Sequence, residues 1–388
     1  MNTQDEKSTV VLVDRILARA YSDRASDIHI EPRPRDVRVR FRVDGLLVEK
    51  PAFDSAFRQK VASRLKVMAN LDIAERRLPQ DGAFRFRIEA VDVDVRLSTF
   101  PTEYGEKVVL RLLPQQDQRL SLSGLGMNED LAGKLRTLSQ HPHGMLLVTG
   151  PTGSGKTSTL YAILQESDSV TRNISTLEDP IEYRFEHVIQ AQTNPRIGFT
   201  FAKGLRAMLR QDPDVIMVGE MRDAETADIA FKAALTGHLV LSTLHTSSAI
   251  ETFVRLFDMG LERYVVASAI NGMLAQRLVR RICQNCCELA PVNDSSKLLF
   301  EEHGIEISHF PRPRGCEQCN QTGYQGRVGI FELISADDQL KDMVKSEQTS
   351  RVQLADFLQQ KGHQGLRFQG LKLVSDGITT INEVVRVT

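Results

Sequence analysis

Tryptophan is absent from the sequence, and aromatic residues make up only 6% of its 388 positions. The formal net charge is −1, because 49 lysines and arginines are balanced by 50 aspartates and glutamates. A motor that moves along nucleic acid needs a basic channel with aromatic side chains on which bases stack. The composition therefore argues against a nucleic-acid partner, while local basic faces remain compatible with it.

Long hydrophobic runs are also missing. The longest apolar stretches, such as residues 145–148 and 239–241, are far shorter than the roughly 20 residues that cross a bilayer. The first fifteen residues mix acids and bases around a short apolar core, which is not the pattern of a signal peptide. We therefore expect a cytoplasmic protein.

Cysteine is scarce, with five residues, but four of them form two CxxC pairs. The pairs are Cys283 with Cys286 and Cys316 with Cys319. Four thiolates so spaced suit a closed tetrahedral Zn²⁺ site with a structural role, and redox-active pairs are the alternative. Cys287 is a spare thiol that could replace Cys286, although the two-residue spacing favours Cys286.

The hydrophobic pattern changes along the chain. Residues 36–48 alternate as a strand, with arginines on one face and apolar residues on the other, within a small α/β region over 1–115. Residues 116–126 are polar with two glycines at the end, which predicts a linker. Short apolar runs separated by helical patterns follow, and these are typical of parallel strands buried on both faces.

The most specific motif is a phosphate-binding loop. Residues 150–157 read GPTGSGKT, which fits G-x-x-x-x-G-K-[ST] with a strand before it and a helix after it. Its glycines would let backbone amides converge on phosphates, Lys156 would contact the β- and γ-phosphates, and Thr157 would bind Mg²⁺. The predicted nucleotide-binding residues in this loop are Gly150, Pro151, Thr152, Gly153, Ser154, Gly155, Lys156 and Thr157.

Two predicted strands end in acidic residues at the sheet edge where the phosphate loop lies. One ends at Glu178 and Asp179, and the other is followed by Glu220. One carboxylate could bind Mg²⁺ through water while the other orients or deprotonates the attacking water, and the residue types alone leave both assignments open. We favour Glu220 for the metal shell and Glu178 for the base, and we group Asp179 with the nucleotide-binding residues.

A third apolar strand, at 239–243, is flanked by two histidines. His238 precedes it and His245 follows it. Either side chain could be a satisfied structural histidine, and the functional alternative is a sensor of the γ-phosphate. We include both among the candidate nucleotide-binding residues.

Taken in order, the motifs GPTGSGKT, STLEDPIEY, DPDVIMVGEMRD and GHLVLSTLHT resemble those of the secretion-superfamily ATPases. The segments SDIHIEP, RFRVDG and VDVRLSTFPTEYGEKVVLRLL resemble the second N-terminal domain of that family. The resemblance covers the chain from about residue 10 to its end. It implies a cytoplasmic ATPase that uses ATP and Mg²⁺ to drive pseudopilus or pilus assembly in type II secretion or type IV pilus machines.

The resemblance also implies partners. We expect a homohexamer, recruited to the cytoplasmic face of the inner membrane by platform proteins, and no first N-terminal domain within this chain. Arg96 and Arg111 match family arginines that reach the γ-phosphate, and ion pairs within their own domain are the alternative. A pilus-retraction ATPase and a RecA-like nucleic-acid motor are the competing functions; the tetracysteine motif, which retraction members generally lack, disfavours the first.

The resulting fold prediction is α/β, with a RecA-like P-loop motor domain. The predicted regions are an N-terminal α/β domain (1–115), a linker (116–126), the ATPase domain (127–282), a tetracysteine zinc module (283–330) and a helical C-terminal region (331–388).

Overall fold

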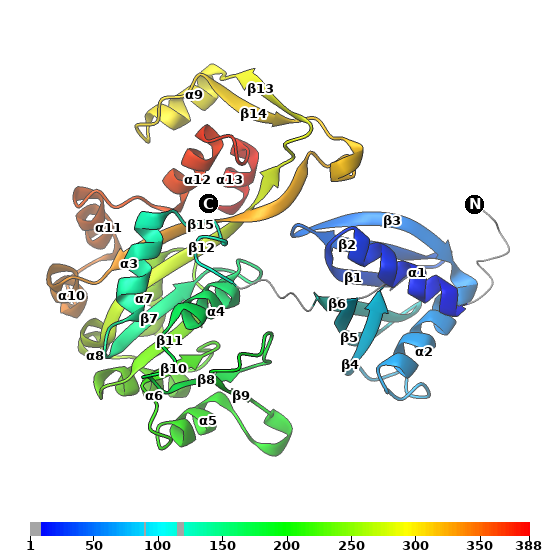
Figure 1. Cartoon of the computed structure of the whole chain (residues 1–388), viewed down its shortest axis with the longest axis horizontal. Helices are drawn as coiled ribbons and strands as arrows, with labels where there is room; N and C mark the ends of the chain where they lie inside the picture. The colour runs from blue at the N-terminus through cyan, green and yellow to red at the C-terminus, as the bar shows by residue number, and fades with distance from the viewer. Residues whose placement is uncertain (1–8, 89–90, 115–119) are drawn as a thin grey trace. The chain divides into compact units, whose positions relative to one another are not determined.

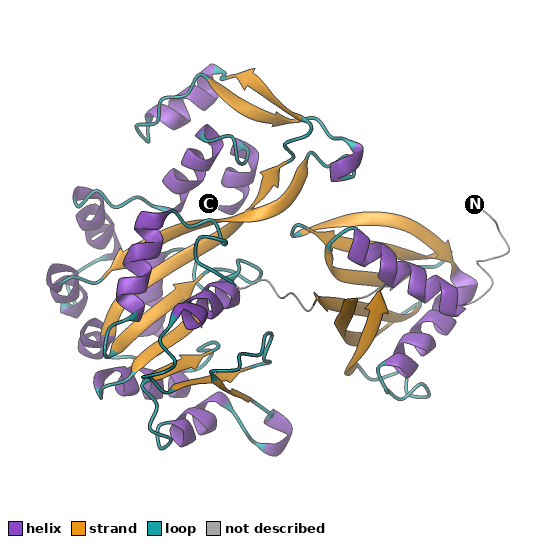
Figure 2. Cartoon of the chain, viewed as in Figure 1, coloured by secondary structure: helices purple, strands orange, loops and turns teal. Residues whose placement is uncertain are grey.

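The computed structural model describes residues 9–88, 91–114 and 120–388. The chain divides into two compact units, Met1–Gln118 and Arg119–Thr388. Figure 2 shows that both units combine helices with β-sheets. The protein is therefore of the α/β class that the hydrophobic pattern predicts.

The first unit is a six-stranded antiparallel sheet with two helices on one face. Its strand order is β3-β2-β1-β6-β5-β4. The strands are β1 (Ala25–Pro32), β2 (Asp36–Val43), β3 (Leu46–Asp54), β4 (Gln80–Ile88), β5 (Val91–Thr102) and β6 (Gly105–Pro114), and the helices are α1 (Thr9–Ser22) and α2 (Arg58–Met68).

Because side chains point alternately to the two faces of a strand, every second side chain of β2 faces the helices. Val37, Val39 and Phe41 of β2 are buried in this core. The single strand expected over 36–48 is instead a hairpin, because Asp44 and Gly45 both have positive φ and reverse the chain. The arginines of β2 therefore lie on the sheet face away from the helices.

The second unit is built on a seven-stranded sheet with the order β15-β12-β7-β11-β10-β8-β9. All neighbouring pairs are parallel except β15 with β12. The strands are β7 (Gly144–Thr149), β8 (Ile174–Glu178), β9 (Ile189–Gln192), β10 (Val215–Val218), β11 (Leu239–Leu244), β12 (Ile270–Ile282) and β15 (Tyr324–Ser335).

Helices cover both faces of this sheet (Figure 1). Leu146 and Val148 of β7 pack with α3 (Glu129–Ser139) and α4 (Lys156–Glu166), whereas Met145 and Leu147 pack on the opposite face. The helices on that opposite face are α5 (Phe201–Met208), α6 (Ala224–Leu235), α7 (Ala249–Asp258), α8 (Arg263–Ala269), α10 (Asp338–Lys345) and α11 (Arg351–Gln360). Because both faces are covered, these strands are continuous hydrophobic runs.

Beyond β12 the chain forms a small module and then returns to the sheet. The module contains β13 (Cys287–Pro291), α9 (Asp294–Glu301) and β14 (His309–Pro313), and α12 (Leu366–Ser375) and α13 (Ile381–Val387) follow the helices named above. The region predicted to be helical, 331–388, begins with the end of β15, because Phe331 to Ser335 pair with β12 at the sheet edge.

The linker predicted over 116–126 is only partly within the described residues, since residues 116–119 lie outside them. In the remainder, Leu122 is 1% exposed and packs in the core beneath α3 and α4. This part is therefore not a free spacer but belongs to the second unit.

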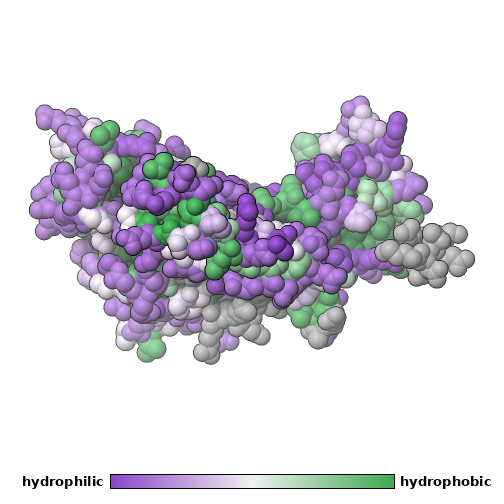
Figure 3. Space-filling model, turned by 90° about the horizontal axis from the view of Figure 1, so that it is seen from above, coloured by the Kyte–Doolittle hydropathy of each residue, from purple (hydrophilic) through white to green (hydrophobic). Residues whose placement is uncertain are grey.

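No helix among the described residues combines the length and the hydropathy that a bilayer span requires. Figure 3 shows a mostly hydrophilic face with small groups of hydrophobic side chains.

Candidate functional site

The phosphate loop joins the buried strand β7 to helix α4 at the carboxyl edge of the sheet. Gly153 and Gly155 have φ angles of 80° and 87°, in the left-handed region that favours glycine. A Cβ atom added to Gly150 would lie 2.5 Å from the carbonyl oxygen of Gln276 in β12, whereas nothing lies within 4 Å of one added to Gly153. The glycines thus allow the backbone to fold tightly against β12 and leave the ligand side of the loop open.

Lys156 begins α4 and is buried. Its Nζ atom donates hydrogen bonds to the carbonyl oxygens of Gly150 (2.8 Å) and Pro151 (3.1 Å). Burial lowers the pKa of Lys156 to about 8, with the Glu220 carboxylate opposing this effect and the Arg277 guanidinium adding to it. The ammonium group therefore lies over the loop, where phosphate oxygens could replace the two carbonyls.

Two hydroxyl groups beside the loop have no partner among the described residues. The Oγ atom of Ser154 and the Oγ1 atom of Thr149 are buried without a hydrogen bond. Buried polar atoms are normally hydrogen-bonded, so such atoms point to a polar ligand. Thr157 lies one residue beyond Lys156 in the first turn of α4, where its hydroxyl can bind the Mg²⁺ of a nucleotide.

Glu220 lies two residues after β10 and belongs to a charged group at the same sheet edge. Its carboxylate forms an ion pair with Arg222 and lies 3.5 Å from Nε2 of His245. Arg222 in turn lies 3.7 Å from the Asp179 carboxylate. The structure therefore brings Glu220, Asp179 and His245 together, and the effect of Glu220 on the pKa of Lys156 connects this group to the phosphate loop.

Glu178 is placed differently from Glu220. It is the last residue of β8, is only 3% exposed, and accepts hydrogen bonds from the hydroxyls of Tyr161 and Thr176 (2.6 Å for Thr176). Gln190 of β9 donates a third hydrogen bond of 3.0 Å. Burial, and then the Glu178 carboxylate, raise the pKa of Tyr161. To act as a base, Glu178 would have to exchange these donors for water.

His238 is a correction to the predicted site. It precedes β11, whose first residue pairs with Gly144 at the start of β7, whereas the phosphate loop follows the end of β7. Six residues of extended strand span about 20 Å, so His238 lies at the opposite edge of the sheet from the loop. Its Nδ1 atom contacts the carbonyl oxygen of Ala233 at 3.0 Å, which is the structural alternative for this histidine.

Arg96 and Arg111 lie in the first unit as directly paired residues of β5 and β6. Their neighbours Val95, Leu97 and Leu112 face the core, so the two arginines lie on the face away from the helices. Arg111 is 59% exposed in its side chain and forms an ion pair with Asp27 (3.0 Å). The apolar sequence around these arginines is thus explained by strand alternation.

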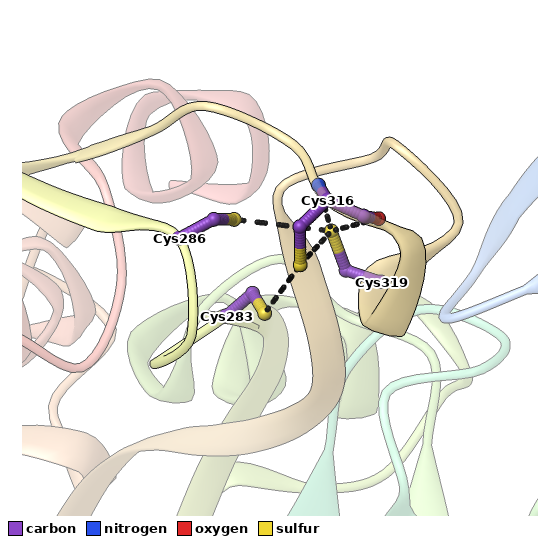
Figure 4. A group of neighbouring side chains, drawn as sticks. All are labelled: Cys283, Cys286, Cys316 and Cys319. Atoms are coloured by element: carbon purple, nitrogen blue, oxygen red, sulfur yellow. Dashed lines mark hydrogen bonds between the residues drawn. The ribbon is translucent and has the colours of Figure 1, made fainter.

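Four cysteines converge where the module leaves the sheet (Figure 4). Cys283 follows β12, and the pairing of β13 with β14 brings Cys286 close to Cys316 and Cys319. Neighbouring Sγ atoms lie 3.7–3.9 Å apart, and all four lie within 4.8 Å of one another. A tetrahedron with zinc–sulfur bonds of about 2.3 Å has sulfurs about 3.8 Å apart, so this group has the size that Zn²⁺ requires.

Nearby N–H groups donate hydrogen bonds to sulfur atoms of this cluster, which favours the thiolate form of the cysteines. The amides of Cys316 and Gly323 donate to the Sγ atom of Cys319 at 3.2 Å each, and Asn285 donates to Cys316 at 3.3 Å. The hydrogen bond from Asn285, followed by a backbone hydrogen bond at Cys319, lowers the pKa of Cys316 to about 6. Cys287 is not part of the cluster, and its Sγ atom contacts the carbonyl of Glu288.

Three residues that contact Glu178 or lie beside the phosphate loop were missed by the sequence analysis. Tyr161 lies inside an apolar helix, and Gln276 and Arg277 lie inside β12. The signal was present in LAQRLV, where two large polar residues interrupt a strand that is otherwise apolar. Without knowing that β12 is a neighbour of β7, this interruption could not be connected with the loop.

A phosphate loop between a buried parallel strand and its helix, with acidic residues at the ends of β8 and β10 in the same sheet, defines a RecA-like P-loop nucleoside triphosphatase. More particularly, residues 2–386 match the family described as "Type II/IV secretion system protein", and the chain belongs to that family.

The similar proteins agree with this family. The chain is 47% identical over its full length to the type II secretion system ATPase E of Vibrio cholerae, of which it covers 77%. It is 48% identical over its full length to the type II secretion system protein E of Pseudomonas aeruginosa, again covering 77% of it.

Solved structures of similar fold include the pilus retraction motor PilT with bound ADP, with a TM-score of 0.63 and 28% identity. That match covers 97% of this chain and 96% of the other. The Legionella pneumophila ATPase DotB shares the fold with a TM-score of 0.71 at 23% identity, over 97% of this chain and 95% of that one.

Proposed function

We propose that this protein hydrolyses ATP to drive pseudopilus assembly, and with it protein export, in a type II secretion machine. The observation that carries the ATPase activity is the phosphate loop, with Lys156 over its carbonyls and the Ser154 hydroxyl buried without a partner in the described part of the chain. The type II assignment is supported by relatives that are 46–48% identical over the whole chain and carry that name.

The side chains divide the chemistry among them. Lys156 would contact the β- and γ-phosphates, and Thr157 with Glu220 would hold Mg²⁺, which neutralises charge that develops on the phosphates. Glu178 is our candidate base, which requires its release from Tyr161. His245 lies beside Glu220, on the side where a γ-phosphate sensor would be needed.

Further parts of the proposal rest on the family. The active form is a homohexamer in which Arg96 and Arg111 reach the γ-phosphate. It works on the cytoplasmic face of the inner membrane, where platform proteins recruit it. The cysteine cluster binds a structural Zn²⁺, because a tetrahedral Cys₄ site leaves no position open for chemistry.

A matched pair of lysine variants tests the activity. In Lys156→Ala we expect ATP hydrolysis to fall below a hundredth of the wild-type rate with the fold intact, because the cation that stabilises phosphate charge is lost. Lys134→Ala is the control, since Lys134 is an exposed residue of α3 that pairs with Asp130 of the same helix. Phosphate release should be measured for both, and wild-type rates in Lys156→Ala would reject the site.

Pilus retraction is the second candidate, because of the likeness to PilT at 28% identity. The two functions predict different phenotypes when the gene is deleted from its host. A type II assembly motor is needed for export of enzymes to the medium, whereas a retraction motor is needed for motility on surfaces. Normal export together with lost motility would favour retraction.

A further inference from the structure

Strand β12 carries a buried arginine that forms no ion pair within the described residues, although the carboxylates of Glu332 and Glu251 oppose the effect of burial on its pKa. Arg277 is 7% exposed, and within the described part of the chain no carboxylate forms an ion pair with it. Burial lowers the pKa of Arg277. A buried charge is expensive unless it is paired or fully hydrogen-bonded, so its hydrogen bonds should explain its position.

All three nitrogen atoms of the guanidinium donate to carbonyl oxygens. Nε donates to Val387 (3.1 Å), one terminal nitrogen to Gln276 (2.9 Å), and the other to Ser247. Val387 lies at the end of helix α13 and Ser247 in the loop after β11, whereas Gln276 is the preceding residue of the same strand, β12. A single side chain therefore joins strand β12 to the C-terminal helix and to the loop of His245. One of its terminal nitrogens also lies close to Gly150 of the phosphate loop.

The loop 245–248 is also bonded to the helix that follows it. Its later residues are tied to α7, where the Ser248 hydroxyl accepts from the Glu251 amide (3.2 Å) and Thr246 contacts Thr252 (3.0 Å). The bond from Arg277 to the Ser247 carbonyl ties the same loop to strand β12. His245, two residues before Ser247, then lies 3.5 Å from the Glu220 carboxylate.

We propose that Arg277 is a positioning residue for ATP hydrolysis, which holds the loop 245–248 so that His245 is aligned with Glu220 beside the phosphate loop. The proposal rests on the ATPase activity proposed above. The planar guanidinium offers several donors in a rigid fork, which suits three carbonyls in different directions, whereas a lysine ammonium on a flexible stem is no substitute.

The chain offers a matched control in Arg280 of the same strand. Arg280 also anchors α13, through the Glu383 carboxylate (2.8 Å), and it is partly buried. Its described contacts do not include residues 245–248. Arg280→Gln should therefore loosen α13 without disturbing His245. Comparing the two variants separates the anchoring of α13 from the placement of the loop 245–248.

Steady-state kinetics test the proposal directly. In Arg277→Gln we expect kcat for ATP to fall at least tenfold while KM changes less than threefold, and Arg277→Lys should stay at least fivefold below wild type. Arg280→Gln should keep kcat within twofold. Recovery of kcat in Arg277→Lys would show that charge alone matters and would overturn the positioning role, as would an equal loss in Arg280→Gln.

A double-mutant cycle tests whether Arg277 acts through His245. His245→Gln should itself lower kcat, and Arg277→Gln added to it should cause little further loss. Independent, multiplicative losses in the double variant would contradict the proposal, and so would an unchanged kcat in His245→Gln.

Amide hydrogen exchange tests the same placement without using activity. In Arg277→Gln the amides of residues 245–248 should exchange at least tenfold faster than in wild type, and in Arg280→Gln they should not. If the wild-type chain did not hydrolyse ATP, the proposed function would fail, and this exchange would still decide whether Arg277 orders the loop. Should Arg277→Gln fail to fold, Arg277→Lys provides the same comparison, and unchanged exchange overturns the inference.

Discussion

The hydroxyl of Tyr161 donates a hydrogen bond to the carboxylate of Glu178, which connects the helix after the phosphate loop to strand β8. The same hydroxyl oxygen accepts a hydrogen bond from the backbone amide of Glu182 (3.1 Å). The segment after β8 is thus fastened to the phosphate-binding helix through one buried oxygen atom.

Removing that oxygen should destabilise the second unit. In Tyr161→Phe the buried Glu178 carboxylate and the Glu182 amide each lose a partner, and we expect about 1–3 kcal/mol less stability toward urea. Tyr183→Phe is the control, because Tyr183 packs edge-on against Tyr161 and its hydroxyl makes no hydrogen bond within the described residues. Equal unfolding free energies for wild type and Tyr161→Phe would show that this network is not stabilising.

The cysteine cluster should hold about one Zn²⁺ per chain. Cys283→Ser or Cys319→Ser should release the metal and make residues 283–330 easier to cleave with protease, because folding of such modules depends on the bound ion. Cys287→Ser should retain the metal, since its sulfur lies outside the cluster. Metal analysis of protein purified without chelator checks this, and a metal-free wild type would reject the site.

Hydrolysis should require assembly of subunits. If Arg96 and Arg111 stabilise the transition state in a hexamer, specific activity should rise with protein concentration, and Arg96→Ala or Arg111→Ala should lower kcat by about 10³-fold or more with little change in nucleotide affinity. Arg38→Ala is the control, because Arg38 lies on the same sheet face and pairs with Glu49. Full activity of a dilute monomer would contradict the assembly requirement.

The ion pairs of Glu383, a residue of helix α13, should make the stability of the second unit dependent on pH. Burial raises the pKa of Glu383, but hydrogen bonds from Arg386 and Arg280 outweigh burial and lower this pKa to about 2. Because the ordinary value of 4.5 is higher, the unfolded chain takes up this proton first. The stabilisation is therefore complete above about pH 5 and is lost as the pH falls from about 4.5 toward 2.

Urea unfolding of Glu383→Gln measures this contribution. At pH 7 the variant should be less stable than wild type by up to about 3 kcal/mol, and the difference should narrow by about 1 kcal/mol at pH 3.5. Glu301→Gln is the control, since Glu301 is exposed and pairs with Lys297 of the same helix. A difference that is the same at both pH values would contradict the lowered pKa.

Local patterns in the sequence were sufficient to predict several features of this protein. The phosphate loop, the buried parallel strands and the two CxxC pairs each depend on residues that are close together in the chain, and chemistry dictates their spacing. The hairpin turn at Asp44 and Gly45 was also readable, because this residue pair is a common signal for such a turn, but we predicted one strand through it.

The tertiary structure decided the features that depend on which segments are neighbours. His238 and His245 look equivalent in the sequence, yet parallel pairing of β11 with β7 places only His245 at the edge of the phosphate loop. The Glu178 carboxylate is directed to Tyr161 rather than to solvent, and Arg277 bonds to a loop 30 residues before it and to a helix end 110 residues after it. Spacing along a chain specifies periodicity and local turns, whereas the order of strands in a sheet results from packing between distant residues.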